Sequence, residues 1–373
     1  MSRASIPINK NILKELEAKH PQKWIIALEK FKWLQEDKFP TFNQLKKASK
    51  FFGIPFGYFF LNQLPKYTYP FPHYRTQNDT AFIPSQNLID TIKDVSRKQE
   101  WIKSILRDWG YKSLYFAGKY SVGDNVKNIA QEIKKILQIE KNWAEGVPNW
   151  ANAFRFLVDK IENSGVFVVV NGVVGNNTHR KLDVNEFRGF VLYDKIAPFI
   201  FVNNNDAITG KIFTLIHEFV HILVGKSASF DLRDLQPAKD IIEEFCNICA
   251  AEFLVPAKDL EIAYNEGITD PYELAKKFKV SSIVIARRLL DLGFIDKTNF
   301  FEFYNTHIQK EFKMPHKTSG GNFYNVVGQR SSKRFLRIMI TAFKSGDILY
   351  TDFYNILKLK PKTADKVIQL YGE

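Results

Sequence analysis

The sequence predicts an α+β protein whose core combines a small sheet with a buried helix, flanked by helical modules that resemble helix-turn-helix units. Residues 165–175 and 188–203 are rich in Val, Ile and Phe and are interrupted by Gly, Asp and Asn, a pattern typical of short strands. Residues 209–224 are apolar on almost every face, as in a buried helix, and Gly225 is a suitable residue to end that helix. Most of the remaining chain has helical periodicity interrupted by turn residues.

The composition bounds the class of protein. The chain of 373 residues is long enough for two or three domains, and its 45% hydrophobic and 25% charged residues are typical of a soluble globular protein. The net charge of +13 favours a partner rich in phosphate or carboxylate, although charge of this sign also serves solubility. Only two cysteines occur, which excludes a disulfide framework and indicates a cytoplasmic location. The N-terminal MSRASIPINK lacks the apolar segment of a secretory signal, and no stretch approaches the roughly 20 apolar residues of a membrane helix.

Residues 1–63 are predicted to form a helix-turn-helix-like N-terminal domain. Within 41–61, Thr41 is a suitable N-cap for a first helix, and a second helix is expected to start at residue 54. The second segment, IPFGYFFL, offers aromatic side chains where a DNA-reading helix offers Arg, Lys, Asn or Gln. We therefore expect this domain to recognise a protein, and any DNA binding to be weak or non-specific. The residues expected on the buried face of the first helix are Leu45, Ala48 and Phe52.

The rest of the chain divides into four regions where the residue pattern changes. A linker rich in proline and tyrosine and two amphipathic helices, near 86–109 and 124–138, precede the strands. Two more pairs of helices follow the core, at 270–295 and 346–372. The predicted regions are 64–146 (linker and helices), 147–260 (core), 261–310 (helix-turn-helix-like segment) and 311–373 (C-terminal helices).

The helix at 209–224 contains the pattern His-Glu-x-x-His. Residues four apart face the same side of a helix, so the imidazoles of His217 and His221 can bind one metal ion. Zinc suits this donor set, and Glu218, beside the ion rather than on it, is placed to act as general base for an attacking water. The alternative is a core helix that holds two histidines by accident, but two imidazoles and a carboxylate in an apolar helix cost desolvation free energy unless a partner compensates them.

A catalytic zinc site requires a third protein ligand and an open fourth position. The next predicted helix, 239–256, offers Glu243 as that ligand, and Asn247 four residues later is expected to orient a histidine ligand. The alternative for Glu243 is a solvated residue in the acidic first turn of the helix, a role that Glu244 can fill.

Two cysteines in the same predicted helix form a Cys-x-x-Cys pattern. Redox pairs of this type favour a helix N-terminus, whereas Cys246 and Cys249 lie in mid-helix. No second Cys-x-x-Cys exists to complete a four-sulfur metal site, so we interpret both thiols as core residues.

Residues 188–295 resemble the ImmA/IrrE family of bacterial and phage zinc metalloproteases. The segments GFVLYDKIAPFIFVN, KIFTLIHEFVHIL, EEFCNICAAEFLVP and LAKKFKVSSIVIARRLLDLGFI occur in the order of that family. The family has Ala and Phe where this chain has Cys246 and Cys249, whereas Glu243 and Asn247 match. The N-terminal segment 40–61 is also similar to the Cro/repressor-type helix-turn-helix that many members carry at this end.

The resemblance implies a zincin-like core and a zinc-dependent endopeptidase. It implies a protein substrate, a transcriptional repressor or antitoxin encoded nearby, whose cleavage releases stress-response, mobile-element or toxin–antitoxin genes. The competing interpretation is a DNA-binding antitoxin or transcriptional regulator without catalysis, in which a fourth protein ligand such as Cys246 makes the zinc site structural. The sequence carries no signature of the oligomeric state.

Three further predictions concern residues outside the metal ligands. His179 and Tyr193 are candidates for stabilising an oxyanion. The strand near 188–193 or 197–203 is expected to present an exposed edge that binds substrate as an added strand. A group of basic residues near the predicted core is interpreted as a solvated helix face; it comprises Lys276, Lys277, Lys279, Arg287 and Arg288.

Overall fold

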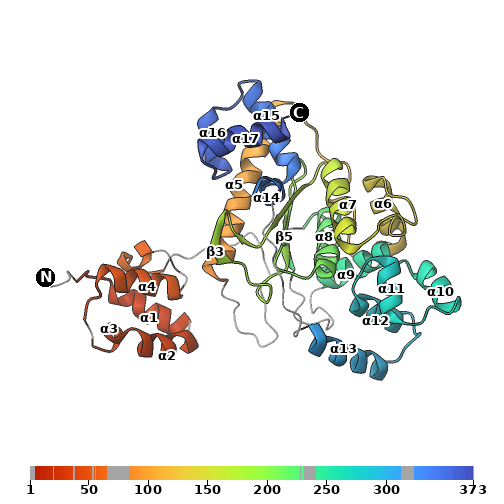
Figure 1. Ribbon diagram of the computed structural model, residues 1–373, viewed down its shortest axis with the longest axis horizontal. Coiled ribbons are helices and arrows are strands. Elements are labelled where there is room, and N and C mark those ends of the chain that lie inside the picture. Colours follow the sequence, from red (N-terminus) through yellow and green to blue (C-terminus); the bar gives the residue numbers. More distant parts are fainter. Residues whose placement is uncertain are drawn as a thin grey trace. The chain divides into compact units, whose positions relative to one another are not determined.

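A computed structural model of the chain places two compact units, residues 1–92 and 93–373, which are described separately (Figure 1). Apart from its first residue, the proline- and tyrosine-rich stretch at 64–77 lies outside the residues that the structure describes. The described residues are 5–19, 21–36, 38–52, 54, 56–64, 84–226, 228–230, 241–311 and 323–372.

The first unit is helical and encloses its own apolar core. Amphipathic helices bury one face each, with Leu16, Ala27 and Leu45 among the fully enclosed side chains. The elements of this unit are α1 (Lys10–Lys19), α2 (Pro21–Lys30), α3 (Lys32–Gln35), α4 (Phe42–Phe52) and the short 3-10 helix η1 (Phe56–Phe60).

Helix α4 begins as the sequence predicts, but the segment after it does not. The Thr41 hydroxyl accepts a hydrogen bond from the Gln44 amide, and the Gln44 side chain accepts one from the Thr41 amide, so the two residues form a capping box. The expected second helix from residue 54 is instead the five-residue η1. Gly57 and a run of aromatic residues have low helix propensity, which disfavours a longer α-helix here.

The second unit combines helices with a small sheet. Helix α5 (Gln86–Asp108) crosses the boundary between the units, and its residues from Lys93 onward belong to the second unit. The other helices are α6 (Val126–Leu137), α7 (Trp150–Asn163), α8 (Ile208–Val224), α9 (Ile241–Leu254), α10 (Ala257–Asn265), α11 (Pro271–Phe278), α12 (Ser282–Asp291), α13 (Lys297–Glu311), α14 (Phe323–Ser331), α15 (Lys333–Lys344), α16 (Tyr350–Ile356) and α17 (Pro361–Tyr371). The strands are β1 (Phe167–Asn171), β2 (Val173–Val174), β3 (Asn177–Lys181), β4 (Gly189–Leu192), β5 (Phe199–Asn203) and β6 (Ala228–Phe230).

The main sheet has the strand order β1-β5-β4-β6, and β2 and β3 form a separate hairpin. Strand β1 is parallel to β5, while β4 is antiparallel to both β5 and β6. A turn joins β4 to β5: Asp194 Oδ1 accepts hydrogen bonds from the amides of Ile196 and Ala197 and shapes this turn.

Alternation along the strands gives the sheet two different faces. Aromatic side chains cover one face, where Phe167 stacks on Phe199 at 4.6 Å between ring centroids and Phe190 stacks on Phe201 at 4.8 Å. Phe335 of α15 packs edge-on against the first of these pairs. Because side chains alternate along a strand, the opposite face is aliphatic and belongs to the core that contains α7, α8 and α9. Its residues include Val168, Val170, Val191, Ile200 and Val202.

The prediction that β4 or β5 presents an exposed edge is wrong for the described structure. Strand β5 lies between β1 and β4, and β4 lies between β5 and β6. The sequence of a strand shows which residues alternate, but it does not show whether a distant segment pairs with its edge.

Helices α11 and α12 form the expected pair, but one member of the predicted basic face is buried. Arg288 is only 7% exposed and forms an ion pair with Glu252 of α9, and its Nε donates a hydrogen bond to the Val255 carbonyl. Arg288 therefore connects this helix pair to α9 and does not face solvent.

Among the helices that the structure describes, none has the combined length and apolar character that crossing a bilayer demands.

Candidate metal centre

Helix α8 holds the His-Glu-x-x-His pattern inside the core. His217, Glu218 and His221 are all 0% exposed. Gly225 follows the helix with a φ of +79°, a left-handed conformation that favours glycine, and its amide donates to the His221 carbonyl. The amide of Gly118 donates to the Ile222 carbonyl at 2.9 Å, so the last turn of the helix is also hydrogen-bonded from outside.

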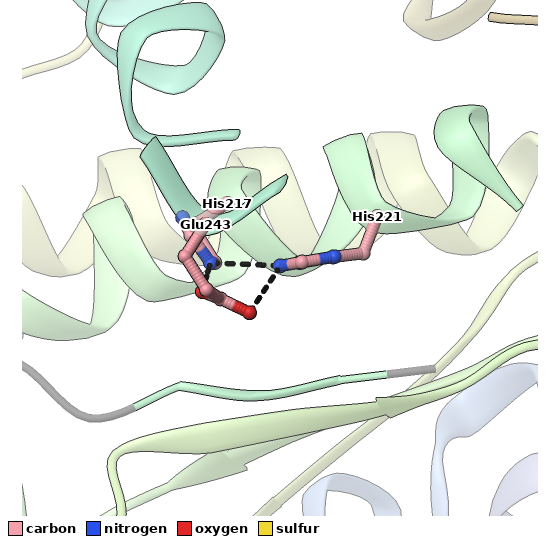
Figure 2. Close-up of side chains that lie close together, drawn as sticks. All are labelled: His217, His221 and Glu243. Atoms are coloured by element: carbon pink, nitrogen blue, oxygen red, sulfur yellow. Dashed lines mark hydrogen bonds and ion pairs between the residues drawn. The ribbon is translucent and has the colours of Figure 1, made fainter. Parts of the chain in front are cut away.

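Helix α9 packs against α8 and brings Glu243, in its first turn, to both histidines. His217 Nε2 lies 3.1 Å from Glu243 Oε2, and His221 Nε2 lies 3.3 Å from Glu243 Oε1. The two Nε2 atoms are 3.0 Å apart. Figure 2 shows the three side chains converging on one point, with the carboxylate of Glu243 facing both rings.

Electrostatics bind the three groups together. Burial alone would raise the pKa of Glu243, but hydrogen bonds and charge interactions with the two histidines lower it well below its ordinary value. Burial lowers the pKa of His217, and its contact with Glu243 offsets part of that effect. Glu243 therefore remains ionised and the buried His217 tends toward the neutral form, which are the states in which carboxylate and imidazole bind metals.

The donor set and its spacing fit a zinc ion. One ligand atom from each of the three residues lies within 4.8 Å of the others, and this is the metal-capable group found in the described part of the chain. An ion about 2.0–2.2 Å from each ligand in tetrahedral geometry would separate those ligands by roughly 3.3–3.6 Å. The observed separations of 3.0 to 3.3 Å require only a small adjustment.

Glu218 lies beside this cluster and is not part of it. Both of its carboxylate oxygens are buried and have no hydrogen-bond partner among the described residues. Burial, followed by the charge of Glu243, raises the pKa of Glu218 well above its ordinary value. The hydroxyl of Thr214, one turn earlier on α8, is likewise buried without a partner in the described structure. Buried polar groups normally have hydrogen-bond partners. The groups without a partner next to the candidate metal centre can therefore take a water molecule or a substrate as that partner.

Gly189 of β4 lets the sheet approach this part of α8. A Cβ atom at Gly189 would lie 2.5 Å from Thr214 Cγ2, 2.8 Å from the Phe201 carbonyl oxygen and 3.3 Å from Glu218 Oε1. Our sequence reasoning did not identify Gly189 as part of the site. A glycine inside a strand pattern often marks close approach of another segment, and that signal was present in FRGFVL.

The residues predicted around the ligands lie on α9 as follows. Asn247 is close enough to His217 to raise the pKa of that imidazole by hydrogen bonding, although its buried Oδ1 has no hydrogen bond of standard geometry in the described structure. Glu244 is exposed, whereas Glu243 is the glutamate that reaches the histidines. Cys246 and Cys249 are fully buried in the core, and burial raises the pKa of the Cys249 thiol to about 12.

The two oxyanion candidates lie in different surroundings. His179 is exposed on β3 of the hairpin. Tyr193 packs partly buried against the core, with its hydroxyl near Gly118 and Gly225 at the end of α8. Neither belongs to the group of His217, His221 and Glu243.

Comparison with known families gives one result. Residues 161–290 match the family model Peptidase_M78, described as the IrrE N-terminal-like domain. The match supports the resemblance to the ImmA/IrrE family, suggests a metallopeptidase of that type, and implies a metal that is usually zinc. It extends from the end of α7 to α12 and so contains the whole candidate metal centre. A search of the curated proteins finds no match.

Proposed function

We propose that this chain is a zinc-dependent endopeptidase that cleaves a transcriptional repressor or an antitoxin-type protein, and so derepresses stress, mobile-element or toxin–antitoxin genes. The observation that carries the catalytic part is the convergence of His217, His221 and Glu243 next to the enclosed carboxylate of Glu218. The repressor-type substrate rests on the resemblance to the ImmA/IrrE family. We place the reaction in the cytoplasm.

The proposed chemistry assigns a separate task to each group. His217, His221 and Glu243 hold the ion, which when bound supplies Lewis acidity toward the scissile carbonyl and lowers the pKa of water. Glu218 accepts a proton from the attacking water and passes it to the leaving amine. Its enclosed position favours this, because burial raises its pKa and helps it to keep the proton between the two steps. Asn247 fixes the orientation of the His217 ring.

The alternative of a non-catalytic regulator requires a fourth protein ligand. Cys246 is the nearest thiol in sequence to Glu243, but the group of ligand atoms in the described structure does not include its sulfur. Three protein ligands leave one tetrahedral position for water or substrate, and this count favours the enzyme over a structural zinc site.

The N-terminal unit is proposed to recognise a protein, with DNA contact weak or non-specific. Phe42 and Phe60 are 54% and 45% exposed, and both rings contact Phe56, at 5.1 and 5.5 Å between centroids. An exposed aromatic cluster of this kind fits a protein surface, since aromatic residues dominate the centres of protein interfaces. The cognate repressor is the proposed partner.

The test measures metal and cleavage separately. Gently purified protein should hold about one zinc per chain by elemental analysis, and His217→Ala or His221→Ala should remove it. Glu218→Gln should keep the zinc and abolish cleavage of the repressor encoded nearby, while Glu244→Gln, a matched change at an exposed site, should affect neither. Protein without any transition metal, or a Glu218→Gln variant that still cleaves, would refute the proposal.

A further inference from the structure

Three residues of β6 occupy the edge of β4. The pairing is antiparallel, with Gly189 opposite Phe230, Phe190 opposite Ser229 and Val191 opposite Ala228. Strand β6 is the last strand in the order β1-β5-β4-β6, so without it β4 would be the edge of the main sheet as described. This short pairing follows directly after α8 in the chain.

The covered edge lies beside the candidate catalytic group. Gly189 and Val191 belong to the face of β4 that packs on α8, because Gly189 is opposite Val202 in the register. A side chain at Gly189 would meet Glu218 and Thr214, and the residue that pairs with Gly189 on the other strand is Phe230. Strand β6 also lies close to α8, which ends four residues before the strand begins. Figure 2 shows strands of the sheet running past the side of α8 from which the two histidines project.

The burial of the candidate site is what we expect if the edge of β4 is already occupied. His217, Glu218 and His221 have no exposed surface in this arrangement and the side chain of Glu243 is 24% exposed, although the scissile bond of a peptide must come next to Glu218 to be cleaved. An extended peptide satisfies its backbone amides most readily by adding to a strand edge, and β4 supplies the strand edge next to Glu218. That edge has room for one strand, so β6 and a peptide exclude each other.

We infer that β6 is an internal occupant of the peptide-binding edge of β4, and that an extended peptide substrate binds by replacing it. This inference rests on the proposed endopeptidase function. Three paired residues make a small number of hydrogen bonds, each of modest net stability, so a longer peptide that also fills side-chain positions can compete. The chain then limits cleavage to substrates that bind well enough to displace its own strand.

Proline in β6 provides the test, because proline cannot donate a hydrogen bond to the neighbouring strand. Adjacent residues of a strand point their amides to opposite sides. Only one of the variants Ala228→Pro and Ser229→Pro therefore removes a hydrogen bond to β4, and the other variant is its control. Ser229→Ala, which keeps the amide, is a second control. The probe is a mixture of internally quenched, unstructured peptides with varied central residues.

We expect one proline variant to raise kcat/KM for this mixture about tenfold, mainly through KM, with zinc content and thermal unfolding near those of the unmodified chain. In the same variant, combined with Glu218→Gln to prevent turnover, hydrogen exchange at 189–192 should speed up and should slow again when peptide is added.

Cleavage that neither proline variant raises would overturn the inference alone. Unchanged exchange at 189–192 in both proline variants would do the same, because β6 would then not cover β4 in solution. If the unmodified chain and both proline variants cleave neither this mixture nor the repressor while they retain zinc, the proposed endopeptidase function is overturned and this inference with it.

Discussion

Replacing Gly189 by alanine tests how closely α8 and β4 approach at the site. The added methyl group would lie 2.5 Å from Thr214 Cγ2, whereas carbon atoms in contact normally lie about 3.5–4.0 Å apart. It would also lie 2.8 Å from the carbonyl oxygen of Phe201, which belongs to the backbone of β5 and cannot rotate away. Either the helix or the strand must therefore shift.

The size of the effect follows from the two contacts. Extra methyl groups in a packed core cost typically 1–3 kcal/mol, and a contact against backbone belongs at the upper end, so we expect a loss of about 3 kcal/mol in the free energy of unfolding. Removing only the Thr214 methyl group with Thr214→Ser should recover part of that loss in the double variant, since neighbouring sites couple by about 0.5–3 kcal/mol. The Phe201 contact should keep the recovery incomplete.

Denaturant unfolding followed by circular dichroism measures the change in stability, and cleavage of the repressor measures the change at Glu218. Gly146→Ala is the matched control, because a Cβ there would meet only the Trp143 carbonyl at 3.8 Å. It should be neutral or more stable by about 0.5 kcal/mol. If Gly189→Ala unfolds at the same denaturant concentration as the unmodified chain, the close packing of β4 on α8 is wrong.

Three further predictions concern the ligand register, a buried acid and the N-terminal unit. Glu243→Ala should weaken zinc binding in a metal titration and Glu244→Ala should leave it unchanged; the reverse would place the ligand one residue away. Burial raises the pKa of Glu162, against the lowering effect of its hydrogen bond from Ser332, so the folded state holds this proton more tightly than the unfolded chain. Stability should therefore fall as pH rises from 4.5 through the raised value, and thermal unfolding should show that Glu162→Gln removes this fall. Deleting residues 1–63 should impair cleavage of the repressor without changing zinc content, and the intact chain should give no tight operator footprint at physiological salt; a footprint lost on deletion would restore a DNA-reading role.

Much of the fold could be predicted from local patterns in the sequence. The apolar helix at 209–224 was predicted almost to the residue, since a glycine that ends a helix is a local signal, and the structure has α8 at Ile208–Val224. The turn between β4 and β5 was also predictable, because Asp194 and the proline that follows it favour a turn. Of the two glutamates, the structure brings Glu243 to the histidines and leaves Glu244 exposed, and the metal-binding role of Glu243 stays a prediction.

Features that depend on distant segments were not predictable in the same way. Arg288 has the sequence context of a solvated residue, and its burial depends on Glu252 from another helix. The covered edge of β4 depends on β6, whose three residues are too short to give a strand pattern. The second N-terminal helix shortens to η1 because the low helix propensity of Gly57 and its aromatic neighbours outweighs the general helix-turn-helix pattern.

The metal and strand β6 both supply partners to polar groups that would otherwise be unsatisfied in this buried region. Glu218 brings a buried carboxylate into an apolar core beside the partly exposed carboxylate of Glu243, and the imidazoles of His217 and His221 are polar groups without exposed surface. Such a group is costly unless a cation compensates its charge, so metal binding should stabilise the fold as well as equip the site. An unpaired edge of β4 beside it would add unsatisfied backbone groups to the same region. A strand as short as β6 satisfies that edge while remaining easy to exchange, which is what a buried site needs if a peptide is to enter it.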